Sequence, residues 1–204
     1  MPTVPKRWPG ETFVLLGGGP SLTPEDVVSA QGHTRVIAIN TACLLAPWAD
    51  VLYACDGKWW AWHSGVPTFT NPKYSIDPAA AKWPGVDVLA NTGPLGLELD
   101  PTGLRTGKNS GYQAINLAVH LGAARILLLG YDMAPSSDGR THWHGDHPDR
   151  QPSPYGAMLE AFPSLVEPLA AIGVPVINCS RRTVLKTFPC TPLADELARL
   201  ERAA

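Results

Sequence analysis

Three histidines stand within six residues of one another in the segment THWHGDHP, which begins at Thr141. They are His142, His144 and His147, and Asp146 lies among them. Imidazole and carboxylate groups together suit zinc or another divalent ion, so the segment is a candidate metal site. Histidine also titrates near neutrality, so the same segment is a candidate source of a general base. A solvated polar loop is the third interpretation, and the residue types leave all three open.

A run of three glycines ends the first apolar segment of the chain, in LLGGGPSL from Leu15. The candidate binding residues there are Gly17, Gly18, Gly19 and Ser21. Backbone without side chains lets the phosphate or base of a ligand lie against N–H groups. A tight turn between a strand and a helix uses the same residues without a ligand. The spacing matches neither the GxGxxG pattern nor a Walker motif, since no Lys-Ser/Thr follows.

The segment KNSGYQAINLAVHLGA predicts a helix whose start is suited to an anion. Asn109 or Ser110 can cap the first turn, and Gly122 can end the helix. A helix N-terminus offers free N–H groups and the positive end of its dipole to a phosphate. Lys108 precedes this start, and Gly111 lies in it. Plain capping accounts for the same residues, so both interpretations stand.

Continuous apolar runs of strand length are the elements that must position these residues. Strands buried on both faces need no polar alternation, which favours a parallel sheet. We predict an α/β protein with a Rossmann-like, mainly parallel sheet and helices on both faces, in a single domain over residues 1–204. The expected interior strands are Val14–Leu16, Val36–Ile39, Ile126–Leu129 and Val174–Ile177. Further strand candidates lie at Ala49–Asp56, Val66–Asn71 and Val86–Ala90.

Helices are expected in the intervening segments. Thr23 can cap a short helix that has Pro24 at its first position. A helix over residues 155–172 contains Pro163 and Pro168, so a break or kink is expected there. The segment PLADELARLERA predicts a terminal helix.

Polar residues stand where the predicted strands end. In an open α/β sheet, ligands bind outside the carboxyl ends of the strands. We therefore expect the glycine turn, Asn40 and the helix start at Ser110 to form one pocket, and the histidine segment to close over it. The other polar residues at strand ends are Thr41, Asp56, Tyr131, Asp132, Asn178, Ser180 and Arg181.

Composition narrows the class of protein. The chain has 204 residues and a formal net charge of −2, which does not favour an electrostatic nucleic-acid binder. Its four cysteines form no CxxC pair, as in a protein of a reducing compartment. The N-terminus lacks the apolar core of a signal peptide, and no apolar run has the length of a membrane span. A cytoplasmic protein is expected.

Four segments together resemble a known family. LLGGGPSL, VIAINTA with ADVLYACD, KNSGYQAINLAVHLGAARILLLGYDM and INCSRRTVLKTFP occur in the order seen in the bacterial sialyltransferases of glycosyltransferase family 42. They are also similar to the related domain of motility accessory factors and archaeal-type hydroxymethylpterin pyrophosphokinases, and to small phage proteins. The resemblance implies a Rossmann-like fold with a nucleotide at the strand ends.

The resemblance also implies roles for particular residues. The glycine turn and Asn40 would contact the nucleotide, and Ser110–Gly111 would lie beside its phosphate. The strand end GYD, with Tyr131 and Asp132, would approach the nucleotide, and a histidine of the 142–147 segment would be the general base. The family's tyrosines near the leaving phosphate have no counterpart directly after Asp132, where Met133 and Ala134 follow.

The leading functional hypothesis is a nucleotide-binding transferase that moves a glycosyl group from a nucleotide sugar and requires no cofactor. The first alternative is a metal-dependent pyrophosphokinase or other phosphoryl transferase, in which Asp56, Asp132 and the histidine segment hold a divalent metal. The second alternative is a non-catalytic phage-type protein that binds a nucleotide or another protein. Catalytic activity, the donor, the acceptor and the oligomeric state stay open, and a homo-oligomer is compatible with the sequence.

Overall fold

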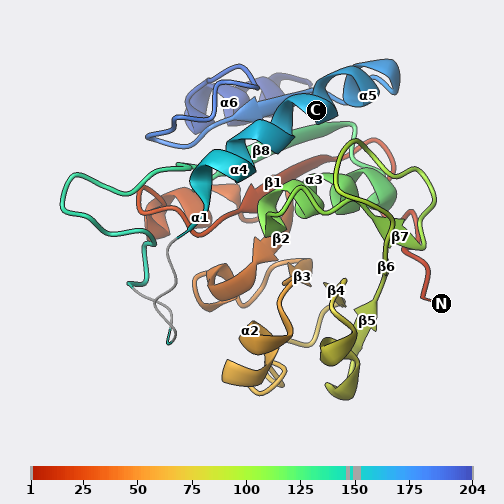
Figure 1. The fold of residues 1–204 in the computed structure, drawn as a ribbon. Coiled ribbons are helices and arrows are strands. Elements are labelled where there is room, and N and C mark those ends of the chain that lie inside the picture. Colours follow the sequence, from red (N-terminus) through yellow and green to blue (C-terminus); the bar gives the residue numbers. More distant parts are fainter. Residues whose placement is uncertain (1, 146–147, 149–152, 204) are drawn as a thin grey trace.

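Seven parallel strands form the main sheet of the computed structural model, which describes residues 2–145, 148 and 153–203 (Figure 1). This is the α/β, Rossmann-like architecture that the apolar runs predict. In spatial order the strands are β5 (Val86–Val88), β4 (Lys73–Ser75), β3 (Val51–Tyr53), β2 (Arg35–Ile39), β1 (Thr12–Leu16), β8 (Arg125–Leu129) and β9 (Val176–Asn178). A small parallel pair, β6 (Ala90–Asn91) and β7 (Gly103–Leu104), lies beside it.

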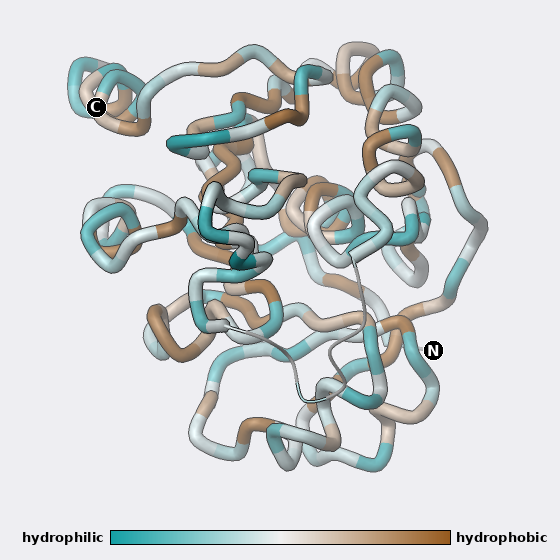
Figure 2. The backbone as a smooth tube through the Cα atoms, turned by 60° about the vertical axis from the view of Figure 1, so that its left-hand side comes forward, coloured by the Kyte–Doolittle hydropathy of each residue, from teal (hydrophilic) through white to brown (hydrophobic). Residues whose placement is uncertain are grey.

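Alternate residues of the strands enter two separate cores. In β1, Phe13 and Leu15 face one core, and Val14 and Leu16 face the other. All four side chains are fully buried. Both faces of the sheet are covered, which is why the strand sequences show no polar alternation. Figure 2 shows the resulting hydrophobic stretches running through the sheet.

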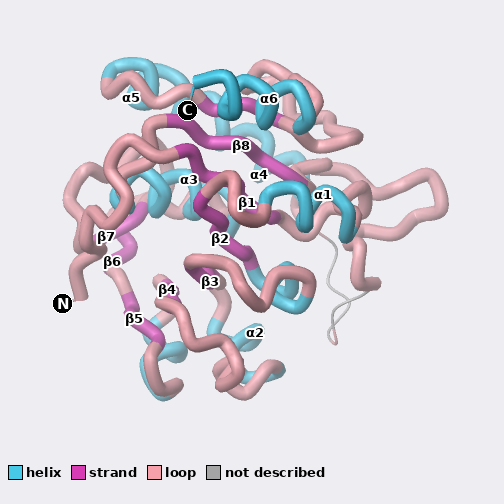
Figure 3. The backbone as a smooth tube through the Cα atoms, turned by 180° about the vertical axis from the view of Figure 1, so that it is seen from behind, coloured by secondary structure: helices cyan, strands magenta, loops and turns pink. Residues whose placement is uncertain are grey.

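The helices divide between these two faces. In Figure 1, α3 (Ser110–Leu121) and α5 (Val166–Ala171) lie in front of the sheet, where Ile115 and Leu169 join one core. Seen from behind in Figure 3, α1 (Pro24–Ala30) and α6 (Leu193–Ala203) cover the opposite face. The remaining helical elements are α2 (Gly57–Trp62), α4 (Tyr155–Ala161) and the short 3-10 helices η1 (Asn40–Leu44), η2 (Pro78–Lys82) and η3 (Phe162–Leu165).

Helix boundaries follow the expected capping residues. The Thr23 side chain accepts a hydrogen bond from the Asp26 N–H at the start of α1. The Asn109 side chain caps α3 through the Tyr112 N–H, and Gly122 ends that helix in the left-handed conformation. The 155–172 segment is broken into α4, η3 and α5, as its prolines predict.

Two strand expectations are wrong in detail. The segment Val66–Asn71 is not a strand: the Phe69 N–H bonds to the Val66 carbonyl in a turn, and both side chains still reach the core. The fourth strand begins later, at Lys73. The Val174 N–H bonds to Leu169 at the end of α5, so β9 starts only at Val176 and forms an edge of the sheet instead of an interior strand.

Truncation of a central strand residue tests this core. Leu128 of β8 is fully buried, whereas Leu99 is 64% exposed. We expect Leu128→Ala to lower the free energy of unfolding by about 2–5 kcal/mol, because it removes buried methyl groups and leaves a cavity. The matched Leu99→Ala variant should stay within about 0.5 kcal/mol. Urea unfolding measures both, and equal losses would contradict the assigned core.

Candidate functional site

A pocket of about 360 Å³ opens at the carboxyl ends of β1, β2, β3 and β8. The strands that follow β1 extend the sheet on one side of it, while β8 and β9 lie on the other, so the pocket is at the point where strand order reverses. This is the usual ligand position in open α/β sheets, and the volume is within the range of small-molecule sites. The structure thus brings the glycine turn, Asn40 and the start of α3 to one pocket.

The glycine turn continues the hydrogen bonding between β1 and β8 beyond both strands. The Gly17 N–H donates to the Leu129 carbonyl and the Gly19 N–H to the Gly130 carbonyl, each at 2.8 Å. A Cβ on Gly17 would lie 2.6 Å from the Gly130 oxygen, and one on Gly19 would lie 2.5 Å from it. Close approach of the second strand therefore explains these two glycines without any ligand.

A buried carboxylate, that of Asp132, also connects the glycine turn to the residues that follow β8. The Ser21 N–H and hydroxyl donate to the two oxygens of Asp132, at 3.0 and 2.9 Å. Asp132 is 4% exposed, and its burial raises its pKa, although the hydrogen bonds from Ser21 oppose this. Ser21 itself does not line the pocket. Both residues, expected in the site, thus act on each other and hold the turn in place.

Gly18 is the glycine that faces the histidine segment. Its carbonyl accepts the Trp143 N–H at 3.2 Å, and a Cβ added to it would meet the His142 ring at 3.2 Å. His142 and His144 both line the pocket, with their rings stacked 5.1 Å apart. His142 Nδ1 is hydrogen-bonded to the Thr141 hydroxyl at 3.0 Å. The two histidines therefore lie at the pocket, as expected.

Asp146 and His147 lie outside the described residues. In the part of the chain that the structure describes, no group of three or more His, Cys, Asp or Glu side chains is arranged to hold a metal ion. The metal site expected in the histidine segment includes these two residues, so it stays a prediction from the sequence.

The start of α3 supplies the positive end of a twelve-residue helix to the pocket. Gln113 fixes the helix: its carbonyl oxygen accepts the Tyr53 hydroxyl, and its amide donates to the Thr106 carbonyl. Lys108, Asn109, Ser110 and Gly111 line the pocket. An anion there would meet free N–H groups and a lysine charge.

The hydroxyl of Ser110 donates to the sulfur of Cys55 at 3.0 Å. Burial raises the pKa of Cys55 to about 12, so it is a thiol at neutral pH and not a nucleophile. Its neighbour Asp56 is exposed and lines the pocket at the start of α2. That carboxylate is placed to accept hydrogen bonds from hydroxyl groups of a ligand.

Left-handed backbone gathers at the pocket. Asn40, Lys108 and Met133 have φ angles of 52°, 55° and 54°, and all three line it. The buried Oδ1 of Asn40 has no hydrogen-bond partner within the described residues. A left-handed backbone is strained in residues other than glycine and persists only where the surrounding structure stabilises it. Such strained residues cluster at functional sites.

Tyr131 has a structural role in this arrangement. It is 1% exposed, and its hydroxyl donates to the Gly111 carbonyl at 3.0 Å. A Cβ on Gly111 would lie 2.7 Å from the Tyr131 ring. Tyr131 therefore joins the end of β8 to the start of α3, and Gly111 permits their contact.

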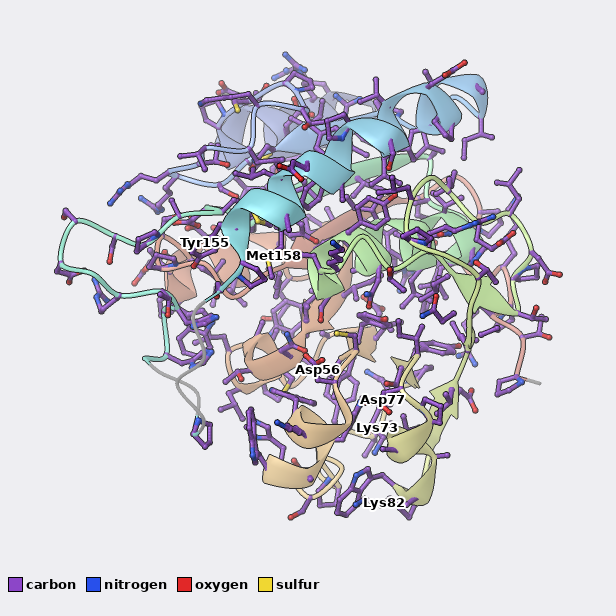
Figure 4. All side chains as sticks on the ribbon, viewed as in Figure 1. Asp56, Lys73, Asp77, Lys82, Tyr155 and Met158 are labelled. Atoms are coloured by element: carbon purple, nitrogen blue, oxygen red, sulfur yellow. The ribbon has the colours of Figure 1, made fainter. Side chains whose placement is uncertain are left out.

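Two residues of α4 complete the pocket, and sequence reasoning missed both. Figure 4 shows Tyr155 and Met158 on α4, across the site from Asp56. The Tyr155 hydroxyl donates to the Thr141 carbonyl, and burial raises its pKa. The Asn109 amide donates to the Met158 sulfur at 3.1 Å. The available signal was the position of Tyr155, in the first turn of the helix that follows the histidine segment.

The other polar residues at strand ends have different positions. Thr41 lines the pocket, but its hydroxyl accepts the Trp59 indole N–H. Ser180 and Arg181 follow β9 and line a separate groove on the far side of Asp132. The carboxyl edge of the sheet thus carries two hollows, with Asp132 between them.

Comparison with known proteins assigns this chain to no family. No protein-family model matches the chain, and no curated protein matches it. No helix of the described residues has both the length and the apolar character needed to cross a membrane.

Alanine substitutions separate the roles of the glycines. In Gly19→Ala the new methyl group would overlap the Asp132 carboxylate and the Gly130 carbonyl. We expect a loss of about 1–3 kcal/mol in the free energy of unfolding, typical of overpacking. Gly18→Ala meets only a side-chain atom at 3.2 Å and should change it by less than about 1 kcal/mol. Chemical denaturation tests this, and a more damaging change at Gly18 would contradict the assignment.

Proposed function

We propose that the pocket binds a nucleotide and that the protein transfers a glycosyl group from a nucleotide sugar to an acceptor hydroxyl. The observation that carries the proposal is the meeting of three features in one pocket at the switch point of the sheet. These are the start of α3, the glycine turn and the histidine segment. The sequence resemblance to the sialyltransferases of glycosyltransferase family 42 supports the same donor class.

The proposed binding mode follows from the chemistry of the walls. The phosphate lies at the N-terminus of α3, where Lys108 adds a positive charge. The sugar hydroxyls of the nucleotide reach the Asp56 carboxylate. The Asn40 amide and the backbone at Gly18 are polar partners for the rest of the nucleotide. Tyr155 and Met158 cover it from α4.

The proposed chemical step uses His142 as the general base. When its Nδ1 donates to the Thr141 hydroxyl, the neutral ring carries its basic lone pair on Nε2. It removes the proton of the acceptor hydroxyl while that oxygen forms a bond to the anomeric carbon. The bond from this carbon to the phosphate oxygen breaks, and the nucleotide leaves with the electron pair. The N–H groups of α3 stabilise the charge that develops on it.

The hypothesis of a metal-dependent phosphoryl transferase is less favoured by the contacts. It assigns Asp132 to a metal ion, whereas both oxygens of that carboxylate accept hydrogen bonds from Ser21. The contacts give Asp132 a positioning role instead.

A kinetic comparison tests the proposal. With a panel of nucleotide sugars as donors, we expect His142→Ala to lower kcat by about 10²–10⁴-fold, the usual contribution of a general base. The affinity for the nucleotide should change less than about threefold, because the base acts on the acceptor. His33→Ala is the matched control, since His33 is exposed and does not line the pocket. Absence of turnover with every donor, or an unchanged kcat in His142→Ala, would overturn the proposal.

A further inference from the structure

A second hollow, of about 430 Å³, lies on the β9 side of Asp132. We call it the β9 groove; Asp132, Arg181, Arg182 and Lys186 are among its walls. Three cationic side chains in one short segment stand out in a chain whose net charge is −2. The proposed transfer reaction leaves this groove without a role.

The floor of the groove is fixed by buried hydrogen bonds. The Asn178 side chain is 1% exposed; it accepts the Ser180 N–H and donates to the Thr183 hydroxyl. That hydroxyl donates to the Tyr131 carbonyl at 2.7 Å, and the Val184 N–H donates to the Asp132 carbonyl at 2.9 Å. The turn after β9 is therefore fastened to the end of β8, which holds the cationic residues beside Asp132.

The cations of the groove differ in what already neutralises them. Arg181 forms a two-bond ion pair with Asp26, at 2.8 and 2.9 Å, so its charge is compensated. Among the described residues, the Lys186 ammonium donates only to a neutral group, the Thr183 carbonyl. Arg182 makes no hydrogen bond or ion pair with any other described residue. The remaining charged residue in the wall is Asp132, whose carboxylate oxygens accept hydrogen bonds from Ser21. The charge of Arg182 acts on this carboxylate electrostatically and helps to lower its pKa, without a hydrogen bond between them.

We propose that the β9 groove binds an oxyanion, the phosphate or carboxylate group of a second ligand, through Arg182 and Lys186. A guanidinium group presents paired N–H donors that match two oxygens of such a group, and the ammonium adds a point charge. A fixed floor lowers the entropic cost of binding. The inference concerns binding alone and holds whether or not the neighbouring pocket takes a nucleotide.

The position of the groove indicates what such a ligand would do. Asp132 lines both hollows, so molecules bound in each would lie on opposite sides of one side chain. If the pocket transfers a glycosyl group, which rests on the proposed function above, an acceptor with an anionic group is the ligand that this arrangement fits.

Amide NMR titration of the full chain tests the groove separately from the pocket. Inorganic phosphate is added in one series and acetate in another, at constant ionic strength. We expect saturable shifts of the amides at 180–186 in at least one series, and the tighter series identifies the oxyanion. Arg182→Gln should weaken this binding at least about tenfold, whereas Arg181→Gln, with the same charge change, should weaken it less than about threefold.

The outcome is distinguishable from any result at the nucleotide pocket. Shifts at residues 17–19 and 108–111 report on that pocket and do not count for the groove. Shifts at 180–186 that do not saturate in either series, or that are equally sensitive to Arg181→Gln and Arg182→Gln, would overturn the inference.

Discussion

The turns after β1 and β8 approach each other so closely that two of their facing positions have no room for a side chain. Backbone hydrogen bonds from Gly17 and Gly19 carry the pairing past the ends of both strands. Ser21 then donates twice to the buried Asp132 carboxylate and closes the contact. A buried carboxylate is costly without such partners. The Ser21–Asp132 pair is therefore the interaction on which the geometry of the site depends.

The pocket follows from this contact. Pairing that extends to Gly19 delays the chain reversal, so that α1 begins only at Pro24, after its Thr23 cap. The carbonyl of Gly18, between the two paired glycines, stays available and receives the Trp143 N–H. The histidine segment is thereby placed at the rim. On the other wall, Tyr131 connects β8 to the start of α3.

Much of the fold could be predicted from local sequence. Apolar runs identified the interior strands β1, β2 and β8 because burial on both faces leaves a continuous signal. Asn109 and Gly122 marked the ends of α3 because capping is local chemistry. The segment Val66–Asn71 was wrongly predicted to be a strand, because its apolar side chains reach the core from a turn. Strand and turn both bury such residues, so composition alone cannot separate them.

The location of the site could be predicted from the sequence, but the separate role of each residue could not. Parallel strands bring their carboxyl ends to one edge, so Asn40 and Ser110 were expected to meet the glycine turn. The partners of the turn, however, lie 111 residues away from Ser21 in sequence, and no local pattern reveals them. The sequence therefore left the glycines without distinct roles. Gly17 and Gly19 contact the end of β8, whereas Gly18 contacts the histidine segment at the pocket.

The central proposal is that a nucleotide binds against the backbone of Gly18, whereas Gly17 and Gly19 serve the fold. Calorimetric titration with a panel of nucleoside mono- and diphosphates tests it most directly, with the parent protein and Gly18→Val compared. The account predicts that the parent binds at least one nucleotide. It also predicts that the variant keeps its unfolding midpoint but binds that nucleotide at least about tenfold more weakly, a loss of about 1.4 kcal/mol. Equal affinity in the two proteins, or binding by neither, would contradict it.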